Sequence, residues 1–176
     1  MRSSKKLAFS SILSALSVIL MLIGSFFGSL DLTAAALASF CVILAVIEMG
    51  YKNATVIFAV SATLSMLLLP SKMPAVYFTV FLGYYPVVKS LAERLSKALS
   101  YVVKYLSYSV AYLILTLAVI NFFPESELRK YLLIAYFVGA AVFLIYDLAL
   151  TRIIGAYCKT LRYRLGIDKF FGNNRR

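Results

Sequence analysis

The sequence predicts an all-α integral membrane protein, a bundle of six transmembrane helices with both termini in the cytoplasm. Of its 176 residues, 62% are apolar and 14% are charged, whereas a soluble domain is about half apolar and a quarter charged. The apolar residues form long runs, and the cations stand at the ends of those runs. We expect a single transmembrane domain over 1–176, because this length leaves little room for a second.

Six apolar runs approach the length of about 20 residues that a helix needs to cross a bilayer. The predicted spans are 7–28, 32–49, 54–69, 75–88, 103–123 and 131–157. The third and fourth are short, and a five-helix alternative would merge or drop them. Pro70 and Pro74 favour a real turn between these two, because proline lacks the backbone donor of a continuous helix. Lys52 and Asn53 are predicted to separate the second span from the third.

The stretch from Lys89 to Lys104 differs from the six spans. Its charged residues recur at helical spacing with leucines between them. This pattern predicts an amphipathic helix on the membrane surface that leads into the fifth span.

The distribution of cations predicts the orientation. Of the 18 lysines and arginines, only Lys72, Arg129 and Lys130 fall in the loops that lie outside when the N-terminus is inside. Short cytoplasmic loops carry the excess of Lys and Arg. We therefore expect a multi-pass protein of the cell membrane, surrounded by lipid, with both termini in the cytoplasm.

The residue types argue against several classes of function. The basic residues form no face with interleaved aromatics, so we expect no nucleic-acid partner. The chain has no histidine and no GxxxxGK phosphate loop. We therefore expect no catalytic residue, no metal site, no cofactor and no enzymatic activity.

Small residues share one face of the first span. Ala8, Ser11 and Ala15 lie at helical spacing, and small residues allow helices to approach closely in lipid. The face serves either packing inside the bundle or docking of another protein, and the pattern leaves both open.

The fourth span contains Gly83, Tyr84, Tyr85 and Pro86. Proline removes a backbone hydrogen bond and crowds the carbonyl of Leu82. An interrupted span often marks a binding site in transporters, and a plain proline kink is the alternative.

Asp147 is the one aspartate well inside a span. A buried charge needs a partner. We predict a structural ion pair of Asp147 with Lys89 or with Arg152.

Aromatic residues and an amide, Asn121, gather in the outer halves of the spans. They form either an interfacial belt or a pocket for a flat, ring-containing molecule.

The chain resembles an S component, the substrate-binding membrane subunit of energy-coupling factor (ECF) transporters, which import vitamins in bacteria. The resemblance rests on six spans in under 200 residues, a basic N-terminus and the pair Ser11 and Ala15, where the family carries Ala-xxx-Ala. It implies docking on a transmembrane coupling subunit with two ATPases. It also implies a vitamin-like small-molecule substrate, with a site near the outer surface at Asp31, Tyr77, Tyr84, Asn121 and Tyr136.

A second family is compatible with the same features. The MreD-type subunit of bacterial cell-shape complexes also has five or six spans, a similar length and no catalytic residues. A membrane scaffold is therefore the alternative to a transport subunit.

Overall fold

The computed structural model describes residues 2–122, 128–157 and 159. Every regular element within these residues is helical. The chain falls into two compact units, residues 6–118 and residues 1–5 with 119–176, and each is considered by itself. The single bundle over 1–176 therefore stays a prediction.

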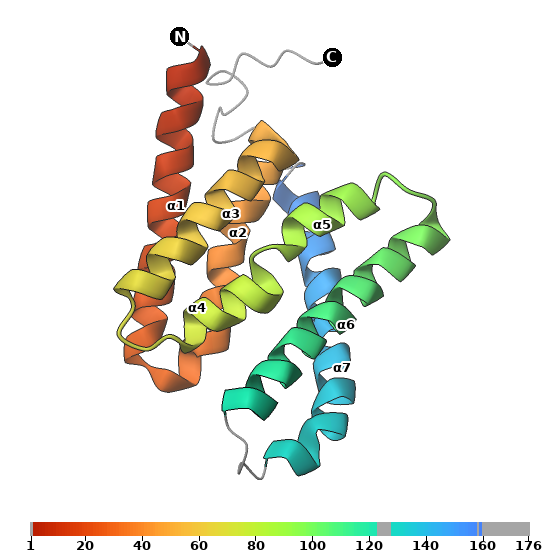
Figure 1. Cartoon of the computed structure of the whole chain (residues 1–176). Coiled ribbons are helices and arrows are strands. Elements are labelled where there is room, and N and C mark those ends of the chain that lie inside the picture. Colours follow the sequence, from red (N-terminus) through yellow and green to blue (C-terminus); the bar gives the residue numbers. More distant parts are fainter. Residues whose placement is uncertain (1, 123–127, 158, 160–176) are drawn as a thin grey trace. The chain divides into compact units, whose positions relative to one another are not determined.

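The unit 6–118 is helical along most of its length (Figure 1). In chain order its elements are α1 (Arg2–Phe26), the 3-10 turn η1 (Gly28–Leu30), α2 (Asp31–Met49), α3 (Tyr51–Leu68), α4 (Met73–Tyr77), the π-helical η2 (Phe78–Leu82), α5 (Tyr85–Ala92) and α6 (Lys97–Phe122). The first residues of α1 and the last of α6 belong to the other unit, whose main element is α7 (Leu128–Ala156).

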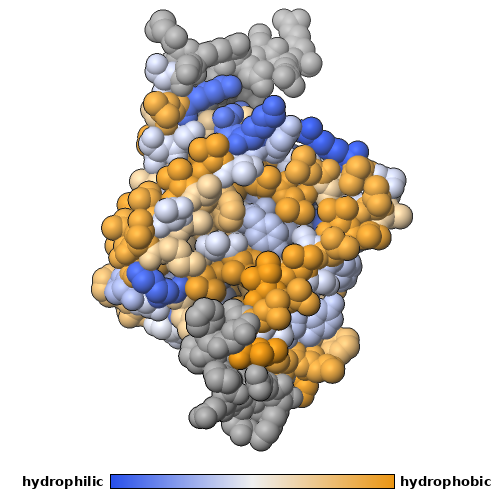
Figure 2. Space-filling model, viewed as in Figure 1, coloured by the Kyte–Doolittle hydropathy of each residue, from blue (hydrophilic) through white to orange (hydrophobic). Residues whose placement is uncertain are grey.

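Within the described residues, six helical stretches are long and apolar enough to cross a membrane, which favours six spans over the five-helix alternative. They are Lys6–Phe26, Gly28–Met49, Tyr51–Leu68, Met73–Ala92, Ala98–Leu117 and Leu132–Ala156. Large apolar side chains remain exposed along them, among them Ile12, Leu64 and Leu113, and apolar residues cover much of the surface seen in Figure 2. Such a surface suits a hydrocarbon solvent, since a soluble monomer rarely exposes large apolar patches.

The break between the second and third spans lies at Gly50, and the prediction that Lys52 and Asn53 form it is wrong. Gly50 adopts φ 83°, a left-handed conformation that glycine accepts without steric cost. Both polar residues belong to the first turn of α3. The Asn53 side-chain amide donates a hydrogen bond to the Met49 carbonyl at the end of α2, at 2.8 Å. Asn53 therefore satisfies a carbonyl at the end of one helix while it belongs to the next.

The predicted surface helix over 89–104 is also wrong. α5 ends at Ala92, a turn follows, and α6 begins at Lys97. Ser96 precedes the first residue of α6, the place where serine is favoured because its hydroxyl can cap free N–H groups. Lys89 therefore belongs to α5, Glu93 and Arg94 lie in the turn that follows it, and Lys97 and Lys104 belong to α6.

The core of the unit 6–118 is built around α2, which packs against α3, α4, η2 and α5. Small side chains make this close packing possible, and Ala35, Ala38 and Ala45 are fully buried. Gly24 of α1 lies so near Ala34 of α2 that a Cβ at Gly24 would overlap the Ala34 Cβ. The core follows the rule that small residues bring helices together in membranes.

Candidate ligand pocket and docking face

The fourth span is interrupted in its middle, as the proline at 86 predicts. Pro86 has no N–H to donate to the carbonyl four residues before it. The backbone widens into the π-helical η2, and the Gly83 N–H donates to the Phe78 carbonyl at 2.6 Å. α4 and α5 thus follow one another with a bend between them (Figure 1). Single π-turns of this kind occur frequently at functional sites.

Gly83 is required by the geometry of this turn. A Cβ at this position would lie 2.8 Å from the Phe78 ring and 2.8 Å from the Phe78 carbonyl oxygen. The Phe78 side chain is fully buried, so it has no room to retreat. The interruption therefore depends on a glycine as well as on a proline.

The interruption directs the Tyr84 side chain toward α6. Its hydroxyl donates a hydrogen bond to the Ser107 carbonyl at 3.0 Å. This bond joins the bent fourth span to the middle of the fifth.

A pocket of about 470 Å³ lies between η2 and α6. Its α6 wall comes from residues three and four positions apart, which lie on one face of a helix. The described lining consists of Thr79, Val80, Tyr84, Ser107, Val110, Ala111 and Ile114. Ligand pockets occupy about 300–1,000 Å³ and combine apolar walls with a few polar groups, and this pocket has that composition.

Tyr84 is the predicted ligand residue that the structure places in this pocket. Tyr77 is half-buried at the end of α4, outside the described lining. Asp31 opens α2, and its Oδ1 atom is buried with no hydrogen-bond partner in the described part of the chain. Tyr136 lies in α7, in the other unit. The side chain of Asn121 lies outside the described residues.

The lining also holds Thr79, one of the residues in the outer halves of the spans where a ligand was expected, and Ser107, which was not predicted as a ligand residue. Serine and threonine are common in membrane helices as packing residues. Nothing in the sequence distinguishes Ser107 from Ser100 or Ser109 on the same helix.

The predicted docking residues Ala8, Ser11 and Ala15 are all exposed on α1. The Ser11 hydroxyl donates to the Leu7 carbonyl at 3.0 Å, so its proton is satisfied within the helix. The other face of α1 carries the buried Leu13, Ser17 and Met21. Here the Ser17 hydroxyl reaches the Ala38 carbonyl of α2 at 3.3 Å. The small residues therefore face away from the packed side of α1.

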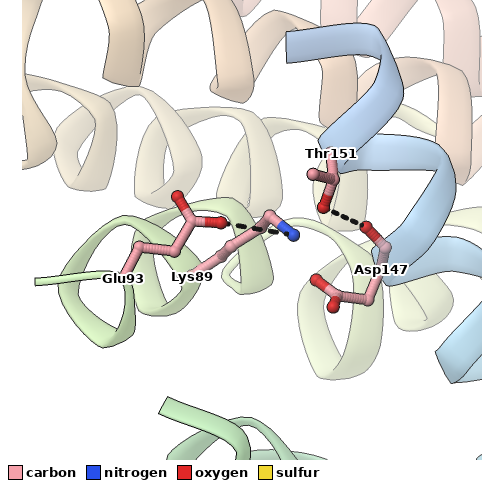
Figure 3. Close-up of polar contacts among 4 residues, drawn as sticks. All are labelled: Lys89, Glu93, Asp147 and Thr151. Atoms are coloured by element: carbon pink, nitrogen blue, oxygen red, sulfur yellow. Dashed lines mark hydrogen bonds and ion pairs between the residues drawn. The ribbon is translucent and has the colours of Figure 1, made fainter. Parts of the chain in front are cut away.

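Two polar contacts of the predicted ion-pair residues are drawn in Figure 3, one in each unit. The Nζ atom of the buried Lys89 lies 3.5 Å from the Oε1 atom of Glu93, the residue that caps the C-terminal end of α5. The Lys89 side chain is 1% exposed and the Glu93 side chain is 50% exposed. In α7, the Thr151 hydroxyl donates to the Asp147 backbone carbonyl at 2.9 Å. Arg152 is exposed. The predicted pair of Asp147 with Lys89 or Arg152 stays a prediction.

Comparison with known proteins adds no relative. No family model, no curated protein and no solved structure matches the chain.

Proposed function

We propose that this chain is a substrate-binding membrane subunit of an importer of the energy-coupling factor type. In this role it captures a vitamin-like small molecule from outside the cell. It then docks on a transmembrane coupling subunit that is driven by two ATPases. Both termini lie in the cytoplasm of the cell that carries it.

The observation that carries the proposal is the exposure of Ala8, Ser11 and Ala15. Small residues that only packed the bundle would be expected on the buried side of α1, beside Leu13 and Ser17. An exposed small face lets a partner helix approach closely, and such close contact is the main source of helix association in lipid. This favours docking over internal packing.

The pocket between η2 and α6 supports the substrate-binding half of the proposal. It lies on an interrupted span, and interrupted spans place ligand groups near the centre of many transporters. Its lining is mostly apolar with three hydroxyl groups, from Thr79, Tyr84 and Ser107. Such a surface suits a ring-containing small molecule.

Co-purification tests the docking half directly. The full chain, isolated in mild detergent from the cells that produce it, should carry a coupling subunit and two ATPases identified by mass spectrometry. The double variant Ser11→Leu/Ala15→Leu should lose these partners, because two large side chains hold the partner helix away.

The matched control is Thr55→Leu/Ala59→Leu, which makes the same kind of change at two exposed positions of α3. It should keep the complex. Loss of the partners in both double variants would contradict a specific role of the α1 face. Recovery of cell-wall or cytoskeletal proteins with the unmodified chain would instead favour the scaffold alternative.

A further inference from the structure

We infer that the pocket between η2 and α6 selects a neutral ring compound that carries N–H groups, and that it rejects anions. This inference deepens the proposed function and rests on it for the assignment of the pocket as the substrate site. It rests on which atoms accept the hydrogen bonds that the hydroxyl groups of the pocket lining donate.

Each hydroxyl in the lining already gives its proton to a backbone carbonyl. Thr79 donates to Ala75 at 2.7 Å, and Ser107 donates to Lys104 at 2.7 Å. Tyr84 donates to the Ser107 carbonyl at 3.0 Å. A hydroxyl has one proton and two acceptor lone pairs. With the protons engaged, a hydroxyl oxygen of this lining that reaches the pocket surface can meet a ligand only as an acceptor.

A ligand N–H therefore adds a hydrogen bond without breaking one. A ligand that only accepts must take a proton from an existing bond of the protein, so one bond replaces another and little is gained. The pocket therefore prefers a ligand with an N–H group, because that ligand adds a hydrogen bond instead of replacing one.

The rest of the lining excludes charge. The other described lining residues are Val80, Val110, Ala111 and Ile114, which are all apolar. An anion would lose its hydration and meet only oxygen lone pairs, and a cation would meet no carboxylate in the described lining. Tyr84 and Ser107 also lie near the middle of the spans Met73–Ala92 and Ala98–Leu117, where a charge is most costly. The fitting ligand is therefore neutral.

Indole and benzofuran are suitable probes, because they share a shape and only indole has an N–H. The chain has no tryptophan, so the fluorescence of indole is free of protein indole emission. The full-length protein in vesicles of neutral phospholipid is titrated with indole, and benzofuran is then added as competitor. We expect indole to bind about fivefold more tightly for the one added hydrogen bond.

Variants that remove one acceptor should reduce this preference. Thr79→Val, Ser107→Ala and Tyr84→Phe each delete a hydroxyl oxygen from the pocket. In the variant whose oxygen receives the N–H, the ratio of the two affinities should fall to about one, while the affinity for benzofuran stays within about twofold. Thr63→Val is the matched control, because the exposed Thr63 donates to the Ala59 carbonyl in the same way, on α3.

Equal affinities of indole and benzofuran for the unmodified protein would overturn the inference. Binding of indole-3-carboxylate as tight as that of indole would also overturn it, and so would the absence of saturable indole binding. These outcomes leave the docking of α1 untouched, since the Ser11 and Ala15 variants test it separately.

Discussion

The Tyr84 hydroxyl donates a hydrogen bond to the Ser107 carbonyl at 3.0 Å, and this bond ties the interrupted fourth span to α6. Both residues belong to the described pocket lining, where Thr79 is the other polar residue. The position of the bond depends on the π-turn before it, so the local conformation of a single span determines the contact between two spans.

Replacement of Tyr84 by phenylalanine should destabilise the protein by about 1 kcal/mol, the usual contribution of one hydrogen bond. The Ser107 carbonyl keeps its place in α6, so the loss should be limited to the missing bond. Thermal unfolding in detergent measures the change. Tyr105→Phe, at an exposed position of the same helix, is the control and should leave the midpoint unchanged. An equal shift in both variants would contradict the role of this bond.

Replacement of Gly83 by alanine should destabilise the protein by about 1–3 kcal/mol, in the range of overpacking. The new Cβ would meet the Phe78 ring and carbonyl at 2.8 Å. Gly28→Ala is a matched control, because no atom lies within 4 Å of a Cβ there. If chemical denaturation gave the same stability for Gly83→Ala as for the unmodified protein, the π-turn would not have the described geometry.

Replacement of Gly24 by alanine should force α1 away from α2 and destabilise the unit by about 1–3 kcal/mol. The cause is overlap with the Ala34 Cβ. The compensating change Ala34→Gly should therefore restore most of the lost stability in the double variant. Additive destabilisation in the Gly24→Ala/Ala34→Gly variant would show that the two residues are not in contact.

The predicted ion pair of Lys89 and Asp147 can be tested by a double-mutant cycle. With Lys89→Met and Asp147→Asn, we expect a coupling energy of about 1–3 kcal/mol, as for contacting residues. The cycle Asp147→Asn with Arg152→Met should show little coupling if Lys89 is the partner. A coupling energy below about 0.5 kcal/mol in both cycles would show that Asp147 forms an ion pair with neither residue.

The orientation of the chain can be read by cysteine labelling in intact cells. With Cys41 and Cys158 replaced by alanine, Lys72→Cys should react with a membrane-impermeant maleimide from outside. Lys52→Cys should react only after the membrane is opened. Both positions are exposed, so access alone decides the result. Labelling of Lys52→Cys in closed cells would reverse the predicted sidedness.

The six spans could be predicted from the sequence because membrane insertion depends on the length and apolarity of a run. Their boundaries depend on local backbone geometry. Gly50 ends the second span through a positive φ, and Ser96 precedes α6. Both residues are visible in the sequence as turn and cap formers, and giving more weight to the charges nearby led to the errors at Lys52 and in the predicted surface helix.

The pocket could be predicted only in part. Pro86 indicates an interruption, and the interruption brings Tyr84 to the site. Ser107 and Thr79 join it through the packing of α6 against η2, which is a tertiary property. For the same reason the spacing of Ala8, Ser11 and Ala15 identifies a small face, while only the fold shows that this face is exposed.

Native mass spectrometry of the complex released gently from its own membrane tests the central claim most directly. The proposed role predicts one mass that contains this chain, a coupling subunit and two ATPases, and a second species of this chain with a retained neutral ring compound that carries N–H groups. A chain that leaves the membrane without any small molecule, bound to proteins of cell-wall synthesis, would contradict a role in solute uptake.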